Sequence, residues 1–126
     1  MGRYRMKIVT DFAAAHLLRD YPGACSRLHG HNWKVEVEVV ATELDHIGMG
    51  MDFRDIKTAT KQLIDRLDHR HLNEIPPFDE INPTAENIAA FLYKNLSDSL
   101  NDERVKVDAI TLWENERACV NYTEEE

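Results

Sequence analysis

Both ends of the chain contain segments in which apolar and polar residues alternate, the period-two pattern of a strand with one buried face. The clearest segment is 32–42, and 4–12 shows the same alternation more weakly. Residues 105–113 and 118–122 are apolar runs typical of two closing strands. In segment 32–42, the side predicted to be buried consists of Trp33, Val35, Val37 and Val39, and the opposite side of Lys34, Glu36 and Glu38.

The middle of the chain has the spacing of two amphipathic helices. The first is predicted to begin at Asp52, whose side chain can cap the free N–H groups of the first turn. The prolines of 75–77 and 82–83 indicate an irregular connection, and a second helix is predicted to start at Thr84. The apolar stripes are Phe53, Ile56, Thr60, Leu63, Ile64 and Leu67 in the first helix, and Ile88, Phe91, Leu92 and Leu96 in the second.

The predicted order is strand, strand, helix, helix, strand, strand, which favours the α+β class. We expect one domain over residues 1–126, with an antiparallel four-stranded sheet and both helices on one face. Such a sheet has exposed edges, and pairing across subunits would cover them.

Composition limits the classes of function. The chain has 126 residues, 43% hydrophobic and 30% charged, as in a soluble globular protein. A net charge of −8 argues against a general binder of nucleic acid or acidic membranes. No apolar run has the length of a membrane span, and the two cysteines fit free thiols in a reducing compartment. We therefore expect a cytoplasmic protein.

Three histidines carry the strongest chemical signal. His29 and His31 are two residues apart, so in a strand their side chains point to the same side. His16 follows the first predicted strand and would reach the same place if the two strands form a hairpin. Three protein ligands leave one coordination position open, which is the pattern of a catalytic zinc site. A structural zinc site would need a fourth protein ligand.

Other residues are open to two interpretations. His69 and His71 form a second H-x-H pattern, but at the end of the first predicted helix, where these positions do not share a face. Either both merely favour the negative end of the helix dipole, or His69 is an imidazole tuned by the carboxylate of Asp68. Cys25 is either a small apolar residue or, close to a metal, a thiolate base. Glu114 ends an apolar strand and could be an ordinary solvated carboxylate, or could accept two N–H bonds from a flat heterocycle.

Several short motifs occur together along nearly the whole chain, and their combined order is specific. They are Phe12-Ala-Ala-Ala-His16, Cys25-Ser-Arg-Leu-His29-Gly-His31-Asn-Trp33, Met51-Asp-Phe53, Leu67-Asp-His69, Leu72-Asn73, Asn82-Pro-Thr84-Ala-Glu86 and Trp113-Glu114. Together they resemble the 6-pyruvoyl-tetrahydropterin synthase superfamily. The Cys-x3-His-Gly-His spacing resembles its bacterial 6-carboxy-5,6,7,8-tetrahydropterin synthase branch, which serves queuosine biosynthesis.

The resemblance implies the tunnelling fold, in which ββααββ subunits join their sheets into a barrel, usually a hexamer with active sites between subunits. It implies that His16, His29 and His31 are the zinc ligands and that Cys25 is the catalytic base. By the same resemblance, Asp68 and His69 are relay partners of the cysteine and Glu114 anchors the pterin ring. Thr84 matches a threonine near the pterin.

The implied substrate is 7,8-dihydroneopterin triphosphate, converted to 6-carboxytetrahydropterin with release of acetaldehyde and triphosphate. One rival is the pyruvoyl-forming synthase, which eliminates triphosphate without carbon–carbon cleavage. A second rival is a pterin- or purine-binding module of the same fold without catalysis. The presence of Cys25, Asp68 and His69 together favours an enzyme, since binding alone needs no proton relay.

Overall fold

The computed structural model describes residues 2–125. Its elements are strands β1 (Tyr4–His16), β2 (His29–Ala41), β3 (Arg70–His71), β4 (Val105–Asn115) and β5 (Ala118–Tyr122), helices α1 (Phe53–Ile64) and α2 (Ala85–Leu100), and the short 3-10 turns Ala24–Ser26 and Leu72–Glu74. The predicted single domain, 1–126, includes Met1 and Glu126, which lie outside the described residues. Neither α1 nor α2 is long and apolar enough to cross a membrane.

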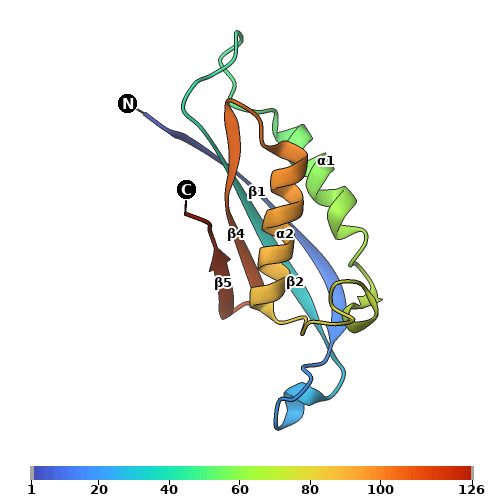
Figure 1. Cartoon of the computed structure of the whole chain (residues 1–126). Helices are drawn as coiled ribbons and strands as arrows, with labels where there is room; N and C mark the ends of the chain where they lie inside the picture. The colour runs from blue at the N-terminus through green and yellow to red at the C-terminus, as the bar shows by residue number, and fades with distance from the viewer. Residues whose placement is uncertain (1, 126) are drawn as a thin grey trace.

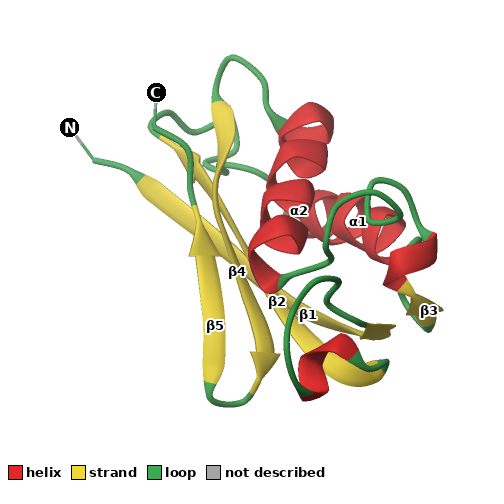
Figure 2. Ribbon diagram, turned by 60° about the horizontal axis from the view of Figure 1, so that its bottom comes forward, coloured by secondary structure: helices red, strands yellow, loops and turns green. Residues whose placement is uncertain are grey.

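The strands form one sheet in the order β3-β1-β2-β4-β5. The β1–β2 pairing runs over the full length of both strands, from Tyr4 opposite Ala41 to His16 opposite His29. Both helices cover the same face of this sheet (Figure 2). The α+β class and the order of the main elements are therefore confirmed.

The covered face is the hydrophobic core. The residues predicted to line one side of the second strand, from Trp33 to Val39, have no exposed surface, whereas Lys34 on the other side is exposed. Ile56 of α1 and Ile88 of α2 are buried against this side. The opposite face carries charged residues, such as Lys7 paired with Glu36. The sheet is therefore apolar on one face and charged on the other, as alternation predicted.

Both predicted helix starts are confirmed. The Asp52 side chain accepts the N–H of Arg54, and Thr84 accepts the N–H of Asn87, so each caps its helix. The predicted end of the first helix is wrong, because α1 ends at Ile64 and tight turns follow. Leu67 is nevertheless fully buried from its place in these turns, which explains why the apolar spacing suggested a longer helix.

The sheet also has a fifth strand that the sequence did not predict. His69 adopts a positive φ of 57° and its N–H donates to the carbonyl of Ala13. The chain then runs parallel to β1, with Arg70 beside Ala14 and His71 beside Ala15. His69 and His71 consequently lie at the edge of the sheet and not at the end of a helix.

Loops extend from the two ends of the sheet in opposite directions (Figure 1). Residues 42–51 leave one end, and residues 17–28, which contain a short 3-10 turn, leave the other. The histidines of β1 and β2 lie at the end from which loop 17–28 departs. This end of the sheet positions the candidate site.

Candidate metal centre and active site

The β1–β2 hairpin brings the three predicted ligands together. His16 ends β1 directly opposite His29, and His31 lies two residues further along β2, on the same face of the sheet. One ring nitrogen from each of the three lies within 4.8 Å of the others. A tetrahedral zinc ion with bonds of ~2.1 Å holds two ligand nitrogens ~3.4 Å apart, so nitrogens grouped within 4.8 Å can share one ion after small ring movements. We refer to His16, His29 and His31 as the histidine triad.

Hydrogen bonds outside the triad orient two of its rings. The Nδ1 atom of His16 lies 2.7 Å from the carbonyl oxygen of Pro83, and the Nδ1 atom of His29 lies 2.7 Å from that of Arg27. Because a carbonyl only accepts, Nδ1 carries the proton in both rings and the Nε2 lone pair is free. Metal-binding histidines are typically fixed by such a second hydrogen bond.

Two of the triad nitrogens are buried and have no hydrogen-bond partner. These are the Nε2 atoms of His16 and His31. Polar atoms in such positions normally have a partner, and a metal ion would satisfy both. The donor set, three neutral imidazoles, is one that Zn²⁺ accepts. The residues present therefore fit a zinc ion.

The surroundings favour the neutral form of the rings. Burial lowers the pKa of His16, which is 1% exposed, and burial also lowers the pKa of His31. The ring of Trp33, fully buried, stands edge-on to both, with centroids 5.1 Å and 5.2 Å away. Neutral imidazole is the form that binds a metal, so the protein does not have to release protons first.

Glu114 lies on the same face as the triad. It is near the end of β4, where the pairing with β5 shifts register between Trp113 and Asn115. Its Oε1 atom is 3.9 Å from Nε2 of His31, and the side chain remains 36% exposed. Trp113 points to the other face, where it donates to Glu36. A half-exposed carboxylate beside the triad can receive N–H groups from a bound ring.

Cys25 occupies the exposed 3-10 turn of loop 17–28. Its carbonyl oxygen accepts the N–H of Leu18, which ties the turn back to the segment just after His16. Among the described residues, the thiol is not one of the clustered metal-ligand atoms. The predicted cysteine therefore lies in the loop that joins two triad residues and remains accessible to solvent.

Asp68 and His69 form an ion pair at the β3 edge of the sheet, with Nδ1 of His69 3.0 Å from Oδ1 of Asp68. The N–H of Ala13 donates to Asp68 at 2.9 Å, and this bond, reinforced by His69, lowers the pKa of the carboxyl group. His69 itself is 82% exposed. The pair is thus a fixed carboxylate next to an accessible imidazole.

Within one chain, the structure of residues 2–125 shows this pair near the triad but not bonded to it. His69 borders a shallow hollow that is also lined by the triad residue His31, together with Ala13, Ala15 and Asn32, which alternate with the triad positions along β1 and β2. Alternate residues of a strand point to opposite faces. Within residues 2–125, no hydrogen bond or ion pair connects Asp68 or His69 to the triad.

Comparison with known proteins identifies the family. The sequence profile of the family described as 6-pyruvoyl tetrahydropterin synthase matches residues 5–125. The chain belongs to the 6-pyruvoyl tetrahydropterin synthase family. The predicted resemblance is therefore confirmed, and the motifs that carried it extend over the matched region.

Two relatives and one solved structure illustrate the similarity. A Haemophilus influenzae protein named 6-carboxy-5,6,7,8-tetrahydropterin synthase is 30% identical, over 90% of this chain and 94% of its own length. A Dictyostelium discoideum 6-pyruvoyl tetrahydrobiopterin synthase is 37% identical, over 64% of this chain and 61% of its own. The structure of Caenorhabditis elegans 6-pyruvoyl tetrahydropterin synthase superposes with a TM-score of 0.85 at 24% identity, over 99% and 98% of the two chains. That last likeness establishes the fold.

The two remaining family motifs have local structural explanations. Thr84, predicted to lie near the pterin, uses its hydroxyl to cap α2, and it follows the carbonyl of Pro83 that orients His16. Asn73 and Asn82 use their side-chain amides to bind the backbone of residues 17–19. Sequence reasoning gave neither asparagine a role, although both stand in motifs that the family shares.

Proposed function

We propose that the chain is a zinc-dependent 6-carboxy-5,6,7,8-tetrahydropterin synthase, a carbon–carbon lyase of queuosine (7-deazaguanine) biosynthesis. One observation carries the proposal: the triad of this family member has two buried, unpartnered imidazole nitrogens, and one of them, Nε2 of His31, lies 3.9 Å from the carboxylate of Glu114. The substrate would be 7,8-dihydroneopterin triphosphate, and the products 6-carboxytetrahydropterin, acetaldehyde and triphosphate.

Each part of the site would have a distinct role. His16, His29 and His31 would hold Zn²⁺, which when bound supplies Lewis acidity to side-chain hydroxyls of the substrate. The carboxylate of Glu114 would accept N–H groups of the pteridine ring and set its distance from the triad. The substrate side chain would then extend from the anchored ring toward the histidines.

Proton transfer would fall to residues outside the triad. The thiolate of Cys25 would remove a proton from the substrate side chain. His69, with its Nδ1 proton directed at the ionised Asp68, has a free Nε2 with which to take up or return protons. Asp68 would hold that imidazole in place, because the N–H of Ala13 fixes the carboxylate.

The placement of the Asp68–His69 pair supports a site shared between subunits. In one chain no hydrogen bond or ion pair among residues 2–125 joins this pair to the triad, and the side chain of His69 at the sheet edge is 82% exposed. If the sheets of neighbouring subunits join into a barrel, the pair of one subunit can approach the triad of the next. We therefore propose a homo-oligomer, with a hexamer as the expected form.

The carboxy product is preferred to the pyruvoyl product for two reasons. The spacing Cys25-x3-His29-Gly-His31 resembles the carboxy-forming branch, and the Haemophilus relative that covers most of this chain bears the carboxy name. The Dictyostelium relative, which bears the pyruvoyl name, is similar over a shorter part of the chain. Both reactions would use the same triad and thiol.

Product analysis tests the proposal directly. Zinc-loaded protein is incubated with 7,8-dihydroneopterin triphosphate, and the pterin product is identified by mass spectrometry. The mass of 6-carboxytetrahydropterin, together with trapped acetaldehyde, is the expected result. A pyruvoyl product would assign the chain to the other branch, and absence of turnover with zinc bound would contradict an enzymatic role on this substrate.

Mixing two inactive variants tests the shared site. His31→Ala removes a triad ligand and His69→Ala removes the imidazole of the other pair. If the site is shared, subunit exchange between the two variants restores activity at about a quarter of the sites, because some interfaces then combine two intact halves. If each chain holds a complete site, the mixture stays inactive.

A further inference from the structure

The backbone just after the triad residue His16 is held by side chains from a distant segment. Leu17 is bound in both directions by Asn73: the N–H of Leu17 donates to Oδ1 at 2.9 Å, and Nδ2 donates to the Leu17 carbonyl at 3.0 Å. Asn82 does the same for Arg19, at 2.8 Å and 3.0 Å. Each side-chain amide thus makes the two hydrogen bonds that a neighbouring strand would otherwise make with this backbone.

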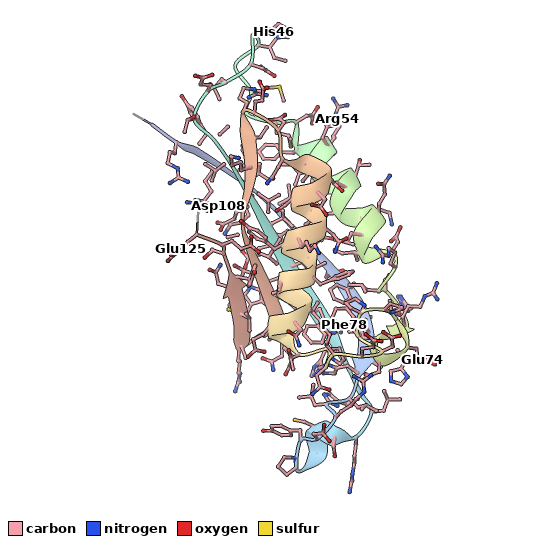
Figure 3. All side chains as sticks on the ribbon, in the orientation of Figure 1. His46, Arg54, Glu74, Phe78, Asp108 and Glu125 are labelled. Atoms are coloured by element: carbon pink, nitrogen blue, oxygen red, sulfur yellow. The ribbon has the colours of Figure 1, made fainter. Side chains whose placement is uncertain are left out.

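The side chain of Arg19 in turn binds the backbone of the segment that contains the two asparagines. Its guanidinium group donates to three backbone carbonyl oxygens, those of Phe78 at 2.7 Å, Ile81 at 3.2 Å and Asn73 at 3.4 Å. These acceptors belong to the segment that contains the two asparagines. Phe78 is labelled in Figure 3, in the half of the molecule from which loop 17–28 extends. We call Arg19, Asn73 and Asn82 the loop clamp.

The backbone of Cys25 is hydrogen-bonded to the opposite edge of segment 17–19, which the clamp holds. Leu17 and Arg19 direct their N–H groups to the clamp, whereas the N–H of Leu18, between them, donates to the carbonyl of Cys25 at 2.8 Å. An extended segment presents alternate N–H groups to its two sides. The clamp therefore fixes the residue whose hydrogen bond holds the backbone of Cys25.

Apolar packing does not hold this loop. Every residue from 20 to 28 is exposed, and the 3-10 turn that contains Cys25 has no buried residue. Loops without buried side chains open at low free energy unless hydrogen bonds order them. The order of the loop therefore depends on the contacts of Leu17, Leu18 and Arg19 at one end and, at the other, on the Arg27 carbonyl that accepts from Nδ1 of His29.

We propose that the loop clamp is a set of positioning residues that hold the Cys25 thiol in its working place relative to the triad. This inference rests on the proposed function, in which that thiol removes a proton from the substrate. Arg19, Asn73 and Asn82 touch neither the triad nor the substrate in this proposal, and they act through the backbone of residues 17–19. Proton transfer requires the donor and acceptor atoms to be close and correctly oriented, and small displacements lower the reaction rate.

The test compares Arg19→Met, which keeps the apolar stem, with Arg19→Lys, which can reach one carbonyl but cannot span three. Arg117→Met is the matched control, because Arg117 lies in the exposed β4–β5 turn. Each protein is assayed for zinc per chain, for kcat and KM, and for amide hydrogen exchange at Leu18. Cys25→Ala is assayed in parallel.

In Arg19→Met we expect kcat to fall by a factor on the order of 10² while KM changes little, since ring anchoring at Glu114 is untouched. The number of zinc ions per chain should equal that of the wild type, and the Leu18 amide hydrogen should exchange faster with solvent. Arg19→Lys should lie between this variant and the wild type. Arg117→Met should match the wild type in all four measurements.

Wild-type kcat in Arg19→Met, with the Leu18 amide exchanging faster, would overturn the inference, as would loss of zinc as the main effect. Failure of the proposed function is distinguishable. If Cys25→Ala keeps full turnover, the thiol is not the base and the clamp has nothing to position. If Cys25→Ala is inactive and Arg19→Met is normal, only the clamp inference fails.

Discussion

The Oε1 atom of Glu114 lies 3.9 Å from Nε2 of His31, so the proposed ring anchor and a proposed zinc ligand stand side by side. A substrate held by the carboxylate would have its reactive side chain directed to the triad. Glu114 is not one of the three clustered ligand residues, so its substitution tests ring anchoring separately from metal binding.

Glu114→Gln should weaken pterin binding while zinc remains bound. One acceptor charge is lost, and a hydrogen bond to a charged group contributes about 1.5–3 kcal/mol, so we expect the Kd for a pterin to rise about 10- to 100-fold. Titration calorimetry with pterin measures this. Glu116→Gln, in the exposed turn next to the strand, is the control and should bind normally. Unaltered affinity in Glu114→Gln would count against the anchor.

His31→Ala should lose zinc and activity together, because two imidazoles remain and zinc sites need at least three protein ligands. Metal content after dialysis and turnover are measured on the same sample. His46→Ala is the control, since His46 is exposed at the end of the molecule opposite Phe78 (Figure 3). Stoichiometric zinc in His31→Ala would refute the assignment of this ligand.

Cys25→Ala should abolish turnover and leave zinc bound, because the thiol is outside the triad. Cys119→Ala, which removes the other exposed thiol, should behave as the wild type. Turnover and zinc content are compared between the two variants. If both retain activity, another group removes the proton.

The metal-free protein should lose stability as the pH falls below about 6.5, the pKa of histidine in an unfolded chain. Burial lowers the pKa of His16 and His31 in the folded chain, so between the two values only the unfolded chain takes up protons. Urea unfolding at several pH values measures the slope. The slope should decrease in His16→Gln and persist in His46→Gln, and equal slopes in all three proteins would contradict the assignment.

Thr84→Ala should lower the free energy of unfolding by about 1 kcal/mol, because the hydroxyl caps α2. Thr84→Ser keeps the capping oxygen and should be close to the wild type in urea unfolding. Thr58→Ala is the control, as Thr58 is exposed within α1. No loss in Thr84→Ala would show that the cap contributes little. A raised KM in the same variant would indicate that Thr84 also contacts the pterin, as the family resemblance suggests.

The sequence predicted those parts of the structure that depend on local pattern. Alternation placed Trp33 and Val37 on the buried side, and the caps Asp52 and Thr84 gave the helix starts. The histidine spacing needed only the hairpin to bring His16 opposite His29. Each of these features follows from residues within a few positions or from one pairing of neighbouring strands.

The missed features depend on contacts between distant segments. Strand β3 has two residues and exists because the N–H of His69 reaches the carbonyl of Ala13. Leu67 follows helical spacing but is buried from a turn. Asn73 looks like an ordinary turn residue in sequence, yet its amide binds Leu17, 56 positions away. No local pattern encodes such a partner.

The hydrogen bond between His16 and Pro83 joins positions 67 residues apart. An isolated β1–β2 hairpin would contain all three imidazoles but not the carbonyl that fixes the tautomer of His16. Strong metal binding therefore requires α2 and its preceding segment to be in place, and a ligand that binds only this folded state stabilises it. Zinc held by the three histidines would be coupled through the His16–Pro83 hydrogen bond to a segment 67 positions away, and its dissociation rate would report on how firmly that segment is folded.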